Sequence, residues 1–114
     1  MLKLVNKYEF YLPDRYLTGD GIATKLHNKA IVNECCKGII IRAGQQAGGY
    51  STREELGYYF IDKTSVSSMK NTVVYFYTND TLPTSVLEGI INYIKTKLLQ
   101  REVMLTINEE AYIL

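Results

Sequence analysis

The stretch from Thr72 to Ile107 constrains the fold most, because three different hydrophobic periods follow one another there. Val73 to Tyr77 is a run of β-branched and aromatic residues, which is typical of a strand. The next block repeats apolar residues at the spacing of one helix stripe, at Leu87, Ile90, Ile91, Ile94 and Leu98. Arg101 to Asn108 then alternates between two faces, as a strand does. The stretch therefore predicts a strand, a helix and a second strand.

The helix within this stretch carries its own start and stop signals. Pro83 suits a first helical turn, and Ser85 stands at capping-box spacing from Glu88, so the start lies within about two residues of Pro83. Basic residues gather at the far end, where they complement the negative end of the helix dipole, at Lys95, Lys97 and Arg101. Gly89 costs a helix up to about 1 kcal/mol relative to alanine, which indicates close packing on the sheet unless the glycine is neutral there.

The first half of the chain predicts a strand, a helix and another strand. Residues 3 to 12 alternate apolar and polar side chains, and Pro13 ends this strand. Asp20 to Cys36 has apolar residues near helical spacing, with Asp20 as N-cap and Gly38 just past the end. Gly38 to Ala43 contains three successive isoleucines, which is typical of a strand buried on both faces.

The middle of the chain predicts a helical turn followed by a hairpin. Ser51 and Glu54 stand at capping-box spacing, so the segment from Ser51 to Leu56 is expected to form one helical turn. Tyr58 to Asp62 and Thr72 to Thr78 have the composition of strands, and the polar segment between them suits a hairpin loop.

This order of elements predicts an α+β fold. We expect a two-layer sandwich in which a mixed sheet of four to five strands is covered on one face by two helices, a ferredoxin-like plan with an extra strand. The short connection near Gln100 would let the final strand run parallel to the strand from Thr72 to Thr78. At this length we expect residues 1 to 114 to form a single domain with a core of its own.

The charge balance and the cysteine pattern exclude several classes of partner. Thirteen basic and twelve acidic side chains leave a net charge of +1, so nucleic-acid binding is disfavoured. No stretch resembles a signal peptide or a membrane helix, so we expect no membrane partner. Cys35 and Cys36 are neighbours and cannot close an unstrained disulfide, which favours the cytoplasm.

Candidate catalytic groups are few. His27 is the only conventional base, and Cys35 or Cys36 could supply a thiolate, although Cys35 continues an apolar helix stripe and is expected to be buried. One histidine and two adjacent cysteines cannot form a four-ligand zinc site, so we expect no metal and no cofactor. An enzyme built on these residues is the less favoured alternative.

One segment has the composition of a ligand loop. Glycines let backbone amides approach an anion, hydroxyls at a helix start add donors, and arginines bind phosphate or carboxylate through two hydrogen bonds. The candidate ligand-binding residues are Arg42, Gly48, Gly49, Tyr50, Ser51, Thr52 and Arg53. The segment matches neither the Walker pattern nor the dinucleotide fingerprint, and a plain turn is the alternative.

The ten tyrosines favour an interaction protein. We expect a non-enzymatic inhibitor, adaptor or assembly subunit, of a kind found in AT-rich bacterial or phage genomes, that binds a protein partner or a second copy of itself through tyrosine-rich surfaces. Strand neighbours point to opposite faces, so some tyrosines must face away from the helices. The alternatives are a binder of a nucleotide or another phosphate-bearing anion that uses residues 42 to 53, and the small enzyme described above.

Overall fold

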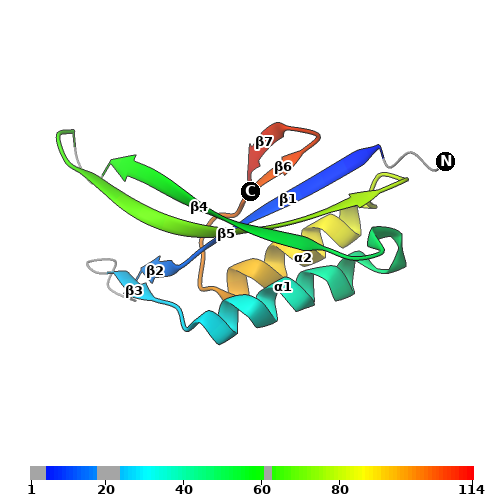
Figure 1. Cartoon of the computed structure of the whole chain (residues 1–114), viewed down its shortest axis with the longest axis horizontal. Coiled ribbons are helices and arrows are strands. Elements are labelled where there is room, and N and C mark those ends of the chain that lie inside the picture. The colour runs from blue at the N-terminus through cyan, green and yellow to red at the C-terminus, as the bar shows by residue number, and fades with distance from the viewer. Residues whose placement is uncertain (1–4, 18–23, 61–62) are drawn as a thin grey trace.

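Two helices lie across one face of a five-stranded sheet. The computed structural model describes residues 5–17, 24–60 and 63–114. The strands are β1 (Asn6–Pro13), β2 (Arg15–Leu17), β3 (Thr24–Leu26), β4 (Ser51–Phe60), β5 (Val66–Thr78), β6 (Met104–Ile107) and β7 (Glu110–Ile113). The helices are α1 (Lys29–Ala43), the short 3-10 helix η1 (Gln45–Ala47) and α2 (Thr84–Lys97). Both long helices run on the same side of the sheet (Figure 1), which confirms the predicted α+β class.

The large sheet has the strand order β4-β5-β1-β6-β7, and β2 pairs with β3 in a small second sheet. Every neighbouring pair in the large sheet is antiparallel. The prediction of a mixed sheet is therefore wrong. β5 and β6 both pair with β1 and therefore run parallel to each other, as predicted, but β1 separates them. The helix between them crosses over this central strand.

Alternation along β1 divides the sheet into a helix-covered face and an open face. Tyr8, Phe10 and Leu12 are buried against the helices. The residues of β1 that alternate with these three face the other side of the sheet, which neither helix covers. The strand register places alternate residues of the neighbouring strands beside them on that side. We call this side the open face, with side chains from Lys7, Glu9, Tyr11, Arg53, Glu55, Tyr75, Tyr77, Met104, Thr106 and Ile113.

The predicted strand from Gly38 to Ala43 is wrong, because this segment is the second half of α1. A short apolar run cannot be distinguished from a buried helix segment by periodicity, and here a helical stripe continues through it, at Val32, Cys35, Cys36, Ile39 and Ala43. The helix begins later than predicted, with the Asn28 side chain accepting a hydrogen bond from the Ala30 amide, and Gly44 caps its end at φ 79°. The expected cap Asp20 lies outside the described residues.

The predicted helical turn at Ser51 to Leu56 is also wrong, because it is the first half of β4. Ser51 pairs with Tyr75, and the ladder continues to the pair of Phe60 and Val66. The first five residues of β4 are all polar, so a serine three residues before a glutamate occurs there by chance. The predicted hairpin is confirmed, and it is longer than expected; the end of its first predicted strand, residues 61 and 62, lies outside the described part.

The C-terminal helix is confirmed. Pro83 is its N-cap, and Ile90, Ile91 and Ile94 are buried against the sheet. The expected close packing at Gly89 is wrong, because a Cβ built there would meet nothing within 4 Å. A close contact to the other helix occurs instead at Gly38 of α1, which lies against Tyr93 of α2.

Candidate functional site

A buried carboxylate stands on the open face. Glu9 is only 6% exposed although no helix covers it. Its Oε2 lies 2.5 Å from Nη2 of Arg53 and 3.8 Å from Nζ of Lys7, and its Oε1 accepts a hydrogen bond of 2.7 Å from Thr106 Oγ1. Burial alone raises the pKa of Glu9, but the hydrogen bonds from Thr106 and Arg53 and the charges of Arg53 and Lys7 outweigh it. The pKa of Glu9 is therefore lowered.

Arg53 links this carboxylate to the rest of the open face. Its Nε donates to Glu55 Oε1 at 2.9 Å, its Nη2 lies 3.5 Å from the Tyr11 hydroxyl, and its guanidinium stands 5.3 Å from the centre of the Tyr75 ring. Burial raises the pKa of Tyr11, and the carboxylates of Glu55 and Glu9 raise it further, so the phenol stays protonated. The guanidinium is thus already paired within the chain.

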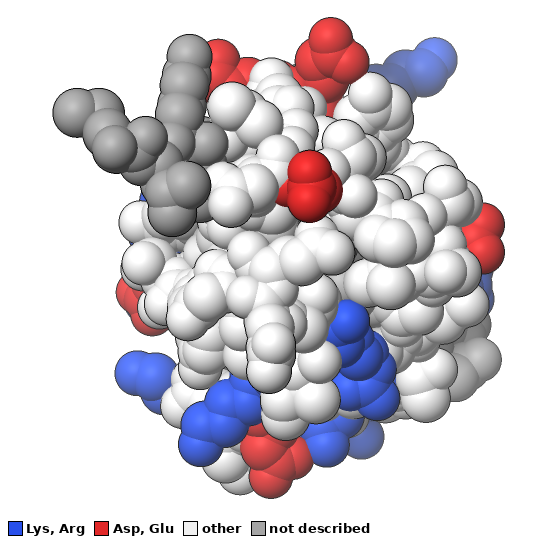
Figure 2. Space-filling view, turned by 90° about the vertical axis from the view of Figure 1, so that its right-hand side faces the viewer, with Lys and Arg blue, Asp and Glu red and all other residues white. Residues whose placement is uncertain are grey.

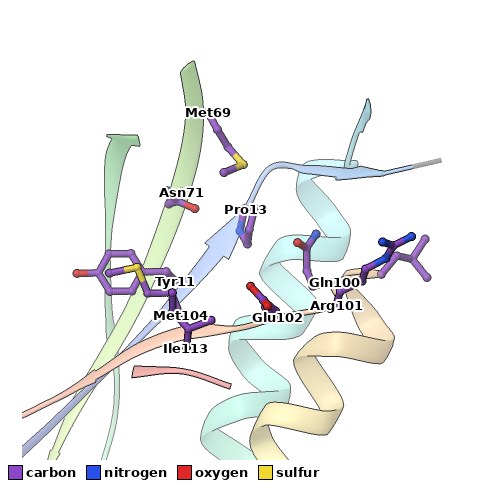
Figure 3. Close-up of a pocket in the computed structure, with 10 residues that line it drawn as sticks. Tyr11, Pro13, Met69, Asn71, Gln100, Arg101, Glu102, Met104 and Ile113 are labelled. Atoms are coloured by element: carbon purple, nitrogen blue, oxygen red, sulfur yellow. The ribbon is translucent and has the colours of Figure 1, made fainter. Parts of the chain in front are cut away.

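A hollow of about 600 Å³ adjoins this cluster at the end of β1, a size typical of small-molecule sites. Its walls come from β1, β5, β6, β7 and the connection between α2 and β6 (Figure 3). The lining residues are Tyr11, Pro13, Met69, Asn71, Leu99, Gln100, Arg101, Glu102, Met104 and Ile113. Tyr11 belongs both to the hollow and to the charged cluster.

The hollow combines apolar walls with a few polar groups. Tyr11, Met69 and Met104 give it an aromatic ring and two thioethers, while Asn71 and Glu102 contribute an amide and a carboxylate. The connection that carries Glu102 is held by the Gln100 amide, which donates to the carbonyls of Arg15 and Leu98 at 2.8 and 2.9 Å. In Figure 3 the Arg101 side chain points away from the other labelled residues. The walls suit a flat apolar group attached to a positively charged one.

The structure does not bring the two predicted arginines together. Arg42 lies in the helical layer, where its guanidinium stacks 3.7 Å from the centre of the Tyr93 ring and donates to the Gly38 carbonyl at 3.1 Å. Arg53 lies on the open face, on the other side of the sheet. They cannot bind one phosphate between them.

The glycines of the predicted loop form a hydrogen-bonded turn. The amide of Gly48 donates to the Gln45 carbonyl at 3.2 Å, and the amide of Gly49 donates to the Ala47 carbonyl at 2.6 Å. Ser51 and Thr52 begin β4 and therefore point to opposite faces. Tyr50 lies beside these glycines in a shallow hollow of about 460 Å³. This geometry supports the turn alternative, and anion binding here stays a prediction.

The candidate catalytic residues also lie apart from the hollow. Cys35 and Cys36 are free and buried in the core. Burial, with a smaller effect of Cys36, raises the pKa of Cys35 to about 12, and burial raises the pKa of Cys36, so both thiols stay protonated. The His27 ring nitrogen Nε2 lies 2.8 Å from the Leu98 carbonyl, and the ring packs 4.7 Å from that of Tyr16. These contacts give all three side chains a structural role.

Charged side chains of both signs occur on the surface of the protein. On the end of the molecule shown in Figure 2, uncharged side chains cover a broad area, and acidic and basic side chains both occur around it. In the described part of the chain, neither helix is long and apolar enough to cross a membrane. Among the same residues, no group of three His, Cys, Asp or Glu side chains could hold a metal ion.

The residues that line the hollow were not singled out in the sequence. Alternation along β1 placed Tyr11 and Glu9 on a polar face, but Met69, Asn71 and Glu102 come from distant segments. Only the strand order brings them together. The alternation of this strand, which places the opposite charges of Lys7 and Glu9 on one face, is the signal that could have pointed to this face.

Comparison with known proteins shows a shared fold. No family model matches the sequence, and no curated protein matches it. A phage SAM lyase in its apo state superimposes with a TM-score of 0.61 at 13% identity, covering 100% of this chain and 94% of that one. A phage SAM lyase in complex with S-methyl-5'-thioadenosine gives a TM-score of 0.60 at 12% identity, with the same coverage. A Bacillus cereus protein related to NIF3 gives 0.55 at 13% identity, covering 96% of this chain and 25% of that chain.

At these identities the likeness concerns the fold. Even so, structures that match this chain over its whole length are those of an enzyme, one of them with a small nucleoside bound. This finding contradicts our prediction of a non-enzymatic inhibitor, adaptor or assembly subunit, and we withdraw that prediction. Of the tyrosines that suggested it, Tyr8 is buried in the core, whereas Tyr11, Tyr75 and Tyr77 lie on the open face.

Proposed function

We propose that the protein binds S-adenosylmethionine in the hollow at the end of β1 and cleaves it as a lyase, releasing S-methyl-5'-thioadenosine. The observation that carries this proposal is the lining of the hollow, an aromatic ring and two thioethers beside an amide and a carboxylate. The full-length likeness in fold to phage SAM lyase supports it.

The proposed substrate matches these walls group by group. S-adenosylmethionine joins a flat adenine base and a ribose to a positively charged sulfonium. The Tyr11 ring and the thioethers of Met69 and Met104 offer apolar contact to the base, and an aromatic face also attracts a cation. The Glu102 carboxylate lines the same hollow and attracts the sulfonium and the ammonium of the amino-acid chain.

The electrostatics of the hollow favour breaking the carbon–sulfur bond. As the bond between sulfur and the γ-carbon of the amino-acid chain breaks, its electron pair passes to sulfur, and the sulfonium becomes a neutral thioether. The substrate's own carboxylate supplies the electron pair for a new carbon–oxygen bond at that γ-carbon, so the amino-acid chain leaves as a lactone. An apolar surrounding stabilises the neutral sulfide more than the cation, so the apolar walls promote cleavage.

The test is to incubate the purified chain with S-adenosylmethionine and to measure S-methyl-5'-thioadenosine by liquid chromatography and mass spectrometry. Glu102→Gln should lower kcat/KM by about tenfold or more, because it removes a charged contact to the substrate cation. Glu88→Gln, at an exposed position on α2, is the matched control and should leave the rate unchanged. No product from the intact chain, together with no thermal stabilisation by substrate or product, would overturn the proposed function.

We also infer that the open face packs against another copy of the chain in the cytoplasm. Part of this face is apolar and exposed, at Tyr77 (41%), Met104 (42%) and Ile113 (66%). Apolar surface of this kind on one side of a sheet is typical of an interface between subunits. Both cysteines are free, which supports a reducing compartment.

A further inference from the structure

Asn71 carries an amide that the chain leaves open toward the hollow. It lies on β5 opposite Pro13 of β1, is half-buried, and lines the same walls as Tyr11 and Met69. Within the described residues its side-chain amide makes no hydrogen bond, neither as donor nor as acceptor. A half-buried amide without partners is unfavourable unless a ligand or water satisfies it.

Gly57 on the neighbouring strand makes room for this amide. A Cβ built on Gly57 would lie 3.2 Å from Nδ2 of Asn71, closer than most side chains tolerate. A glycine at position 57 therefore leaves room for the Nδ2 group of Asn71 on the side of β4.

An asparagine side chain presents one acceptor and one donor side by side. The N6 amino group and N7 of adenine present the matching donor and acceptor, and asparagine pairs with this edge through two hydrogen bonds. Guanine and hypoxanthine carry an oxygen at position 6 instead, so two acceptors would face the amide. The aromatic ring of Tyr11 and the thioethers of Met69 and Met104 supply the apolar surroundings that a base needs.

We infer that Asn71 is the residue that selects adenine, with its Oδ1 accepting from N6 and its Nδ2 donating to N7 of the bound nucleoside. This inference rests on the proposed function. Asn71 comes from β5, whereas Glu102 comes from the connection after α2 (Figure 3). The base is held at β5, and the sulfonium end lies toward Glu102.

The test is a double-mutant cycle between protein and ligand, measured by isothermal titration calorimetry. The ligands are S-methyl-5'-thioadenosine and its 7-deaza analogue, which lacks N7, and the proteins are the intact chain and Asn71→Leu. The intact chain should bind the 7-deaza analogue about fivefold more weakly, the equivalent of one hydrogen bond. Asn71→Leu should bind both ligands equally and more weakly than the intact chain binds the parent.

Further variants keep the outcome decisive. Asn71→Asp keeps the shape and the acceptor but loses the donor to N7, so it should also bind both ligands equally, and it replaces Asn71→Leu if that variant does not fold. Asn92→Leu, at an exposed position on α2, is the control and should keep the fivefold difference. An unchanged ratio in both Asn71 variants would overturn the inference while leaving the proposed function intact. No binding of either ligand by the intact chain would overturn both.

Discussion

Arg53 neutralises the carboxylates of the open face by pairing with Glu9 and Glu55. It is the nearest cation to the buried carboxylate of Glu9, at 2.5 Å, and its side chain is 34% exposed. Arg53→Met should destabilise the protein by about 2 to 3 kcal/mol at pH 7, because it leaves a buried carboxylate without its main partner. Urea unfolding of the variant and the intact chain measures this difference.

The cost of Arg53→Met should depend on pH. The folded-state pKa of Glu9 is lowered, so its ion pair stabilises the protein above the ordinary carboxyl pKa of 4.5 and loses this effect as pH falls through the folded value. The difference between variant and intact chain should therefore shrink in acid. Arg42→Met is the control, since its guanidinium stacks on Tyr93 and no carboxylate pairs with it among the described residues. Equal costs of Arg53→Met at pH 7 and in acid would contradict the assignment.

The candidate residues show why a site of this kind escapes sequence analysis. Arg42 and Arg53 stand in one loop of the sequence, yet one ends on a helix and the other on the far side of the sheet. Arg53 finds Glu9 only because β4 and β1 both flank β5. Local spacing identifies residue types that can bind an anion, whereas pairing between distant strands decides whether they are already occupied.

The two helices meet at a glycine. A Cβ built on Gly38 of α1 would lie 2.2 Å from the Tyr93 hydroxyl oxygen of α2, and Arg42 and the Glu34 carbonyl hold that ring in place. Gly38→Ala should therefore destabilise the protein by about 1 to 3 kcal/mol, despite the better helix propensity of alanine. Gly89→Ala is the matched control, because open space surrounds that position, and it should stabilise by roughly 0.5 to 1 kcal/mol.

Thermal and urea unfolding of both glycine variants distinguish the steric clash expected at position 38 from the gain in helix propensity expected at position 89. If Gly38→Ala stabilises as Gly89→Ala does, the helices do not approach closely at this point. Adding Tyr93→Ala to Gly38→Ala should remove the clash, so the cost of the alanine at position 38 should largely disappear in that background.

Elements with a clear period could be predicted, and elements defined by long-range pairing could not. The spacing of Ile90, Ile91 and Ile94 identified α2 correctly because one helix face supplies its whole buried stripe. Ile39 to Ile41 suited a strand or a helix equally well, and packing against α2 made it helical. The spacing of Ser51 and Glu54 was that of a helix cap, but Ser51 is extended because it pairs with Tyr75 of β5.

At the scale of the molecule, the two-layer plan followed from the order of elements, but the hollow did not. Its walls combine residues from Tyr11 to Ile113, and they meet only because β1 enters between β5 and β6. Unless the strand order is known, the sequence predicts neither which strand ends lie together nor which polar groups face them. The shared architecture with an enzyme, rather than any motif, redirected the functional interpretation.

The open face should also determine the size of the functional unit. The intact chain of 13.0 kDa is expected to sediment as an oligomer at micromolar concentration, because exposed apolar side chains on one sheet face gain from mutual burial. Ile113→Asp places a charge on this face, where Ile113 is 66% exposed, and should shift the protein toward monomer. Ile41→Asp changes an isoleucine that is 74% exposed on α1 and should leave the oligomer intact. A monomeric intact chain, or equal dissociation by both variants, would show that the open face does not hold the copies together.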